Sequence, residues 1–413
     1  NNILSTKEIA LYANENTRNF LRTLNDSLKN EYYANIKQRD SIEIIKNNGT
    51  FLKEKVASDI LLKEKTIQTQ ICSMPGFKQF DPRSIKWNNI SAALKDNEIS
   101  IEFVHNNTNH SEQYYALVVK KDFTAPELIP LFEEKVLKNL LNQPGNSEER
   151  INAIYGKLKD SLYSLIWKPL EGNLNNIQKA YISVSGILYG VSFPAMLNDR
   201  NLDIILVGST RQIAMKTEDK GSKYSSAVLV GGVNYGKTLI SKNKFSSNRS
   251  NFTNLPFTNK EVQDINSILY IGRPDIIVNL VKGDSASEEF FHNLEKIKPN
   301  ILHLATHGFY YASDNFNTSN LLAESFSSIN ISPMLNSGIV LAGANNKSNF
   351  NSENNGILTA QEIARMDLSN LDLAVLSACE TGLGKIDGSE GVFGLQRAFK
   401  QAGTKSLIMS LWK

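Results

Sequence analysis

The stretch that decides the fold is ILHLATHGF, residues 301–309, taken together with LAVLSACETG, residues 373–382. In each, a strand-length apolar run leads into a polar residue, His307 in the first and Cys379 in the second. Uninterrupted apolar runs are typical of strands buried on both faces of a parallel sheet. Because ligands bind at the carboxyl edge of such sheets, we expect His307 and Cys379 to meet there, although 72 positions (379 − 307) separate them.

Further apolar runs indicate that these two strands belong to a larger sheet. AYISVS, DIILVG, AVLVG, GIVLAG and SLIMSLW follow one another from Ala180 onward. Segments of helical pattern, 259–268, 287–297 and 391–402, lie between several of them. Strands joined through helices form parallel sheets, so we predict an α/β domain whose mainly parallel sheet is flanked by helices.

The N-terminal part has a different pattern. Residues 6–70 are rich in Lys, Glu and Asn, with apolar residues near helical spacing, which predicts amphipathic helices. The run from Cys72 to Arg83 holds two prolines and a glycine and is interpreted as a linker. We therefore divide the chain into a helical region, residues 1–75, and one large domain, residues 84–413.

The first part of the large domain mixes both kinds of element. Residues 99–104 and 114–120 favour a β-hairpin, since two β-rich runs flank a polar loop. Residues 87–94, 126–142 and 148–167 favour helices.

Composition excludes several classes of protein. Hydrophobic residues make up 41% and charged residues 21% of the 413, as in globular proteins, and the formal net charge of +3 predicts no direct nucleic-acid binding. Apolar runs of about 18 residues, the length that crosses a membrane, are absent, and the first residues lack a signal-peptide pattern. The two cysteines, Cys72 and Cys379, are too few for a disulfide framework, which favours a reducing, cytoplasmic setting.

A cysteine and a histidine at one sheet edge can form a catalytic dyad. A thiol with a pKa of about 8.5 is only partly ionised at neutral pH, so His307 would act as the base that activates Cys379. The backbone N–H groups of Gly308 and Cys379 would hold the oxyanion of the tetrahedral intermediate. No metal and no cofactor is expected for this chemistry.

The sequence segments around His307 and Cys379 also resemble those of a known family. LHLATHGF, then LSACETGLG, the loop DGSEG and VFGLQRAFKQAGTKSLIMSLW stand in the order found in CHAT-family caspase-like peptidases, which this chain resembles. WKPLEGNL, YISVSGILYGVSFPAML and LPFTNKEV also resemble CHAT sequence, so the resemblance covers residues 87–413. It implies the caspase-hemoglobinase fold and endopeptidase activity, and it maps the family dyad onto His307 and Cys379 without a substitution.

The resemblance also implies a biological setting. CHAT domains often follow tetratricopeptide-type helical repeats, so residues 1–75 are interpreted as a remnant of such an array. A protein substrate, and an activating protein or ribonucleoprotein bound through these helices, are the implied partners, in bacterial defence or signalling. CHAT sequence continues beyond the position of Lys413, so two explanations stay open: the sequence ends at a loop, or the polypeptide is cut after Lys413 as caspase-like zymogens are. In the second case, a C-terminal fragment of the same polypeptide is a further expected partner.

Three alternatives stay open. The chain could be a catalytically silent CHAT scaffold. It could also be a nucleotide hydrolase, because GGVNYGKT, Gly231–Thr238, has the spacing of a phosphate-binding loop, although the Asn/Ser-rich residues that follow favour a helix poorly. His303 and His307 have the spacing of a zinc-binding pair, but Leu304 replaces the glutamate of the zinc-peptidase motif, and His303 is interpreted as a packed residue. His105, His110 and His292 carry no recognisable pattern.

Overall fold

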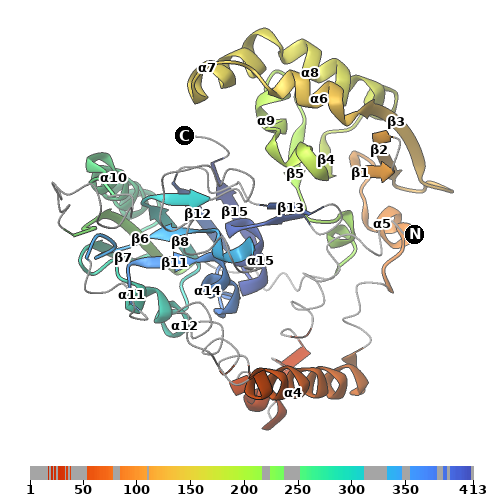
Figure 1. Cartoon of the computed structure of the whole chain (residues 1–413). Coiled ribbons are helices and arrows are strands. Elements are labelled where there is room, and N and C mark those ends of the chain that lie inside the picture. Colours follow the sequence, from red (N-terminus) through yellow and green to blue (C-terminus); the bar gives the residue numbers. More distant parts are fainter. Residues whose placement is uncertain are drawn as a thin grey trace.

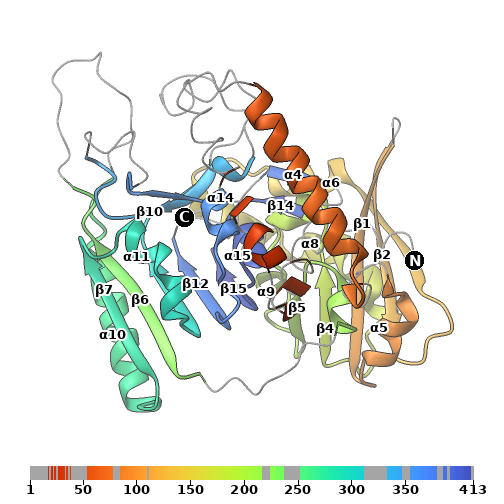
Figure 2. The ribbon, with the colours of Figure 1, turned by 90° about the horizontal axis from the view of Figure 1, so that it is seen from below.

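The structure is a computed structural model of the whole chain. It describes residues 54–77, 84–108, 111–215, 224–236, 252–310, 333–346, 354–378, 385–387 and 391–410, with some residues between 17 and 38. Two five-stranded sheets lie side by side, each with its own helices (Figures 1 and 2). A long N-terminal helix lies apart from both in Figure 1. None of the helices among these described residues is long and apolar enough to cross a membrane.

The C-terminal sheet is parallel throughout. Its order is β15-β12-β8-β6-β7, and each pair of neighbouring strands runs in the same direction. The strands are β6 (Ser226–Val233), β7 (Ile277–Gly283), β8 (Ile301–Ala305), β12 (Leu373–Ser377) and β15 (Ser406–Met409). The predicted α/β fold with a parallel sheet is therefore confirmed.

Alternating side chains explain why this sheet is covered on both faces. In β6, Val228 and Val230 pack into the large core on one face, whereas Ala227 and Leu229 pack with Val262 on the other. The helix that carries Val262 is α10 (Pro256–Gly272). The opposite face is covered by α11 (Glu288–His292), α12 (Leu294–Ile297), α14 (Ala360–Arg365) and α15 (Leu395–Ala402).

The N-terminal sheet is mixed, with the order β3-β2-β1-β4-β5. The strands are β1 (Glu98–Thr108), β2 (Ser111–Lys120), β3 (Glu127–Glu133), β4 (Lys179–Ser183) and β5 (Asp203–Leu206). Strands β1, β2 and β3 pair antiparallel, which confirms the predicted hairpin, and β4 and β5 continue parallel to β1. The helical elements around it are α5 (Trp87–Ala93), α6 (Glu134–Leu141), α7 (Ser147–Asn152), η3 (Ala153–Lys157), α8 (Lys159–Ile166), η4 (Lys168–Asn173), η5 (Gly186–Gly190), α9 (Phe193–Met196) and η6 (Thr210–Ile213).

Four expectations about single elements need correction. The first half of the helix expected over 126–142 is strand β3, because Pro130 disfavours a helix and the segment pairs with β2. The first residues of the helix expected over 391–402 form β14 (Gly391–Phe393), paired with β13 (Lys385–Asp387).

The other two corrections concern which sheet a strand joins. AYISVS and DIILVG are β4 and β5 of the N-terminal sheet, not strands of the C-terminal sheet. GIVLAG belongs to a small antiparallel sheet of β9 (Gly308–Tyr310), β10 (Ser337–Val340) and β11 (Ile357–Thr359), which follows the short helix η8 (Pro333–Leu335).

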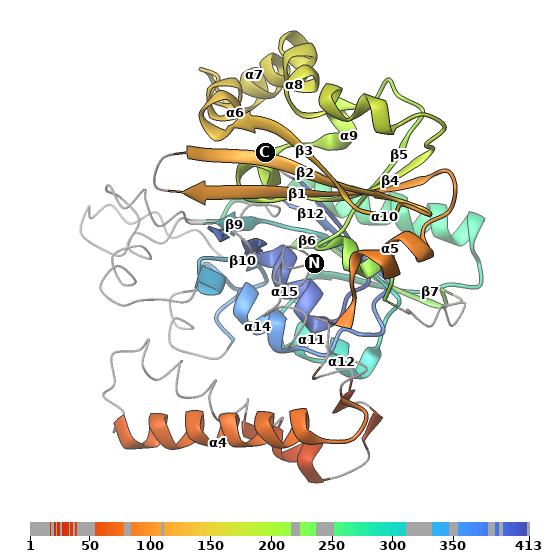
Figure 3. The ribbon, with the colours of Figure 1, turned by 90° about the vertical axis from the view of Figure 1, so that its right-hand side faces the viewer.

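The described N-terminal residues are helical, as expected. Helix α4 (Glu54–Ser73) is longer than the sequence pattern predicts and continues through Cys72 into the expected linker. Buried side chains of Ile67 and Ile71 pack with Phe20, Leu21 and Tyr32 in a small core of their own. In Figure 3, α4 lies beneath α11, α12 and α14, well away from the N-terminal sheet. The exact division of the chain at residues 75 and 84 stays a prediction.

Candidate active site

His307 lies where β8 gives way to β9, at the carboxyl edge of the central strand of the C-terminal sheet. Strand β8 ends at Ala305, and Gly308 already pairs with Ile339 of β10. The carbonyl oxygen of His307 accepts a 2.9 Å hydrogen bond from the Val340 N–H. The backbone around His307 is therefore held on both sides, by the parallel sheet and by the small antiparallel sheet.

The imidazole ring of His307 has a defined hydrogen-bond partner. Its Nε2 atom lies 2.8 Å from the carbonyl oxygen of Thr253. A carbonyl oxygen only accepts hydrogen bonds, so Nε2 carries the proton and, in the neutral ring, Nδ1 keeps its lone pair. This is the tautomer that lets Nδ1 accept a proton.

Two aromatic rings flank the imidazole. The centroids of Tyr235 and Phe252 lie 5.1 and 5.7 Å from that of His307. The Tyr235 hydroxyl is 2.8 Å from Oγ1 of Thr306, which itself donates to the carbonyl oxygen of Val340 at 2.5 Å. Thr306 has a single hydroxyl proton, and it goes to Val340, so the Tyr235 hydroxyl is the donor to Thr306. Burial raises the pKa of Tyr235.

Cys379 lies outside the described residues, but β12, the strand that ends two residues before it, is described. Strands β8 and β12 are direct neighbours, and their last register pair is Ala305 with Ser377. His307 and Cys379 each stand two positions beyond that pair, and neighbouring strands are about 4.8 Å apart. The carboxyl ends of β8 and β12 therefore lie at one edge of the sheet, where Gly308, half-buried at the first position of β9, also lies.

The segment that resembles a phosphate-binding loop is described as far as Gly236, and Lys237 and Thr238 lie outside the described residues. Gly231 is inside β6, where a Cβ atom would stand 2.5 Å from the Thr258 carbonyl oxygen. The N–H of Gly232 donates to Oγ1 of Thr258 at 3.0 Å, and that of Gly236 donates to Oδ1 of Asn234 at 3.1 Å. These two amides are already used within the protein.

His303 and His307 have separate partners. His303 is buried, and its Nε2 atom lies 2.8 Å from Oε1 of Glu261 on α10. His307 instead contacts Thr253 and the two aromatic rings. The interpretation of His303 as a packed residue is confirmed.

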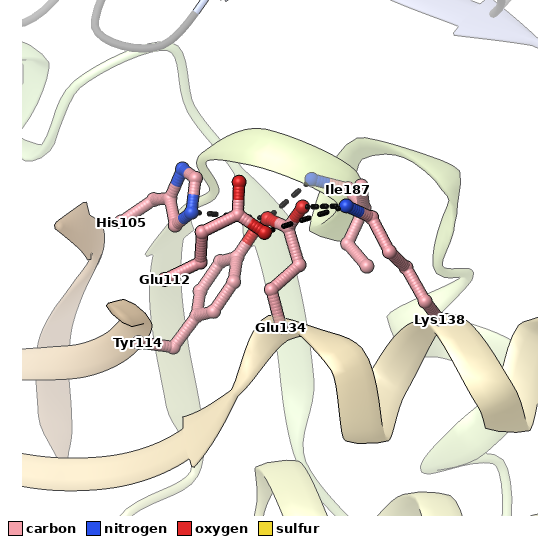
Figure 4. A network of polar contacts seen from close by, with 6 residues as sticks. All are labelled: His105, Glu112, Tyr114, Glu134, Lys138 and Ile187. Atoms are coloured by element: carbon pink, nitrogen blue, oxygen red, sulfur yellow. Dashed lines mark hydrogen bonds and ion pairs between the residues drawn. The ribbon is translucent and has the colours of Figure 1, made fainter. Parts of the chain in front are cut away.

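A polar network in the N-terminal sheet gave no sequence signal, and it includes His105 (Figure 4). The buried carboxylate of Glu134 accepts a 2.7 Å hydrogen bond from the Tyr114 hydroxyl, and its Oε2 lies 3.0 Å from Nε2 of His105. Nζ of Lys138 lies 2.6 Å from the other oxygen of Glu134 and 3.5 Å from Glu112. Burial opposes ionisation of Glu134, but the bonds from Lys138 and Tyr114 and the charge of His105 outweigh it and lower its pKa.

His105, Glu112 and Glu134 each offer one metal-ligand atom within 4.8 Å of the others. Lys138 already supplies a positive charge to both carboxylates, so we interpret the group as an ion-pair network. The same network holds η5, because the Ile187 N–H donates to the Tyr114 hydroxyl at 3.0 Å. Element η5 in turn contacts β13 and β14, the hairpin that follows the Cys379 segment in the chain.

A second buried acid, Glu288, lies at the first turn of α11. Burial and the nearby charge of Glu362 raise its pKa to about 8, although the backbone N–H groups of Gly356 and Ile357 donate to its Oε1. At neutral pH the side chain is therefore mostly protonated. It joins α11 to the segment that leads into β11.

The five-stranded parallel sheet, its helices on both faces and the histidine at its carboxyl edge define an α/β protein of the caspase-like class. The CHAT domain family model matches residues 157–413. That match covers more than half of the chain, so the chain belongs to the CHAT family, which is related to caspase-like cysteine peptidases. A search of curated proteins gave no match.

Proposed function

We propose that the chain is a cysteine endopeptidase that cleaves protein substrates, with Cys379 as the nucleophile and His307 as the base. The observation that carries this proposal is the hydrogen bond from Nε2 of His307 to the Thr253 carbonyl oxygen. It leaves Nδ1 as the basic nitrogen at the edge to which strand β12 directs Cys379.

The reaction would proceed by general base and acid catalysis. Nδ1 of His307 takes the thiol proton, and the thiolate attacks the carbonyl carbon of the scissile peptide bond. The bond between that carbon and the amide nitrogen then breaks, and His307 returns the proton to the leaving amine. Water hydrolyses the acyl-enzyme and restores the thiol. The N–H groups of Gly308 and Cys379 are the proposed donors to the oxyanion.

The tautomer of His307 favours this proposal over a silent scaffold. The bond from Nε2 to the Thr253 carbonyl oxygen leaves Nδ1 as the nitrogen that can take the thiol proton, which the proposed reaction needs and a scaffold does not. Nucleotide hydrolysis is disfavoured by the Gly232 and Gly236 amides, because both donate to protein oxygens, whereas a phosphate-binding loop needs its amides for phosphate.

Activation by a partner is part of the proposal and rests on the family relationship. The N-terminal helices are the proposed receiver of an activating protein or ribonucleoprotein in a bacterial defence pathway. Among the described residues of that region, Leu62 on α4 is 65% exposed and offers apolar surface to such a partner. Cleavage of a zymogen and the cytoplasmic setting belong to the same proposal.

A covalent probe tests the dyad. The chain is incubated with a library of irreversible peptidyl electrophiles, and adducts are located by mass spectrometry. We expect an adduct at Cys379, lost in Cys379→Ala and strongly slowed in His307→Ala. The amino acid of the best probe at the position before the cut would define the primary specificity.

The chain supplies its own control thiol, because Cys72 is exposed on α4, which packs in a core separate from that of the C-terminal sheet. A simple alkylating agent should modify Cys72 equally in wild type and His307→Ala. Peptide cleavage that survives in Cys379→Ala would overturn the proposal, and an activity lost in Lys237→Ala but kept in Cys379→Ala would favour the nucleotide hydrolase.

A further inference from the structure

We infer that Asn345 is a positioning residue for His307, acting through the backbone of Phe252 and Thr253. This inference rests on the proposed function, because it assigns a role in holding the proposed base. Asn345 lies in the turn that follows β10, 38 positions (345 − 307) after the histidine. It does not contact the imidazole itself in any described hydrogen bond.

The side-chain amide of Asn345 binds both polar groups of one backbone residue. Its Oδ1 accepts a 3.0 Å hydrogen bond from the Phe252 N–H, and its Nδ2 donates to the Phe252 carbonyl oxygen at 2.9 Å. A primary amide is the small side chain that offers a donor and an acceptor side by side. The Asn345 side chain thus pairs with the N–H and the carbonyl group of Phe252, as a neighbouring strand would do with its backbone.

The segment held in this way carries the partner of the base. Thr253 is the next residue after Phe252, and its carbonyl oxygen accepts the hydrogen bond from Nε2 of His307. Thr253 is itself exposed. The position of its carbonyl group therefore depends on the anchored neighbour, Phe252.

Asn345 also holds the other ring that flanks His307. Its backbone N–H donates to the carbonyl oxygen of Tyr235 at 2.8 Å, and Nδ2 lies 3.5 Å from the carbonyl oxygen of Gly236. The rings of Tyr235 and Phe252 are 6.4 Å apart, and each lies within 6 Å of the imidazole. One residue thus connects the two chain segments that enclose the histidine.

The turn that carries Asn345 is anchored to the histidine by a second route. The Val340 N–H, at the end of β10, donates to the His307 carbonyl oxygen at 2.9 Å, and the Gly343 N–H donates to the Asn234 carbonyl oxygen at 3.0 Å. The backbone of His307 and the acceptor for its ring are thereby tied to the same turn. Loss of the amide at Asn345 would free the acceptor and leave the backbone in place.

The test compares Asn345→Ala and the isosteric Asn345→Asp with wild type, in the full chain. A carboxylate can still accept from the Phe252 N–H but cannot donate to its carbonyl oxygen, so Asp should be impaired without loss of volume. Displacement of a catalytic group by about 1 Å costs roughly 100-fold in rate. We expect kcat to fall roughly 10- to 100-fold on the best peptide substrate with KM changed less than about threefold, because substrate contacts are retained.

Nitrogen NMR of the imidazoles gives a readout that does not require activity. In protein labelled with ¹⁵N-histidine, and with the signals of His307 assigned from His307→Gln, wild type should show the Nε2-protonated tautomer with a hydrogen-bonded proton. Both Asn345 variants should lose that proton signal or show a mixture of tautomers.

Asn300 offers a matched control. Its amide oxygen accepts from the Ser225 N–H at 3.0 Å and its Nδ2 donates to Asp372 at 3.2 Å, at the opposite edge of the same sheet. Asn300→Ala should lower stability but leave the His307 signals and kcat unchanged. Wild-type His307 signals in Asn345→Ala and Asn345→Asp would overturn the inference. If wild type cleaves nothing even with an activating partner present while the signals change as expected, the proposed peptidase activity fails and the positioning role stands.

Discussion

The Tyr235 ring lies against His307 with centroids 5.1 Å apart and planes inclined by 51°, while its hydroxyl bonds to Thr306, the residue before the histidine. One side chain thus contacts the ring of the proposed base and also the side chain of the residue before it. The two contacts can be separated by mutation.

Tyr235→Phe keeps the ring and removes the hydroxyl. We expect a loss of about 1 kcal/mol in unfolding free energy, the usual contribution of one hydrogen bond, and a kcat reduced only a few-fold. Tyr235→Ala should reduce kcat much further, since the imidazole loses its packing. Denaturant unfolding and peptide cleavage measure both effects, and equal kcat values for the two variants would contradict the role of the ring.

Tyr114→Phe should destabilise the N-terminal sheet by roughly 1–3 kcal/mol, because it removes a partner from buried Glu134 and from the Ile187 N–H. The phenol has room because residue 186 is a glycine. Gly186 has φ +56°, and a Cβ atom there would lie 2.1 Å from the Tyr114 hydroxyl oxygen. Tyr155→Phe is the comparison, because its hydroxyl accepts from the Ser192 N–H. Thermal unfolding should show the larger loss for Tyr114→Phe, and a smaller one would contradict the network.

Lys138→Met should destabilise the protein in a pH-dependent way. The pKa of Glu134 is lowered in the folded state, so the stability it contributes is present above the ordinary value of 4.5 and is lost as pH falls through the folded value. Lys138 is half exposed, so the expected loss at pH 7 is only about 1 kcal/mol, and it should shrink toward pH 4. Lys135→Met, which breaks the exposed pair with Glu133, should cost less. Urea unfolding at pH 7 and pH 4 measures the loss of stability. A loss that is the same at both pH values would contradict the role of the Lys138–Glu134 ion pair.

Glu288→Gln should stabilise the protein at alkaline pH. A carboxyl whose pKa rises from 4.5 to about 8 on folding contributes stability that is complete below pH 4.5 and lost as pH rises through 8. Glutamine does not ionise, so the unfolding free energy of the variant relative to wild type should rise by roughly 1–3 kcal/mol between pH 5 and pH 9. Exposed Glu289→Gln is the control. Unfolding curves at pH 5, 7 and 9 measure the difference, and parallel decline in both proteins would exclude Glu288 as the cause.

Sequence patterns predicted the helices and strands whose own pattern of apolar and polar residues agrees with their burial in the fold. Strands β6, β8 and β12 are apolar runs in the interior of the sheet, and they were expected. Strand β15 was also expected, because its sequence is an apolar run although it lies at one edge and Ile408 is 58% exposed. Strand β7, at the other edge, was not expected, because Asn279 and Lys282 interrupt its apolar run, and its first four side chains alternate between exposed and half-buried positions. Residues 126–133 were expected as helix because the helical pattern of α6 directly follows them, whereas pairing with β2 makes them a strand.

The network around His105 could not be predicted for a different reason. Its partners Tyr114 and Glu134 come from another strand and from a helix start, and each is an ordinary residue in its local sequence. Their meeting depends on the pairing of β1, β2 and β3. No short sequence motif indicates that these residues come into contact.

The sequence by itself determined that a parallel sheet would place His307 at its carboxyl edge, because apolar runs and the residues that end them are local properties. It also predicted Cys379 at the same edge. The tertiary structure decided which nitrogen of His307 carries the proton and what holds the ring. The acceptor is the backbone carbonyl of Thr253, 54 positions away (307 − 253), held by the amide of Asn345. A backbone carbonyl is the same in every residue, so only the folded chain selects the one that contacts the histidine.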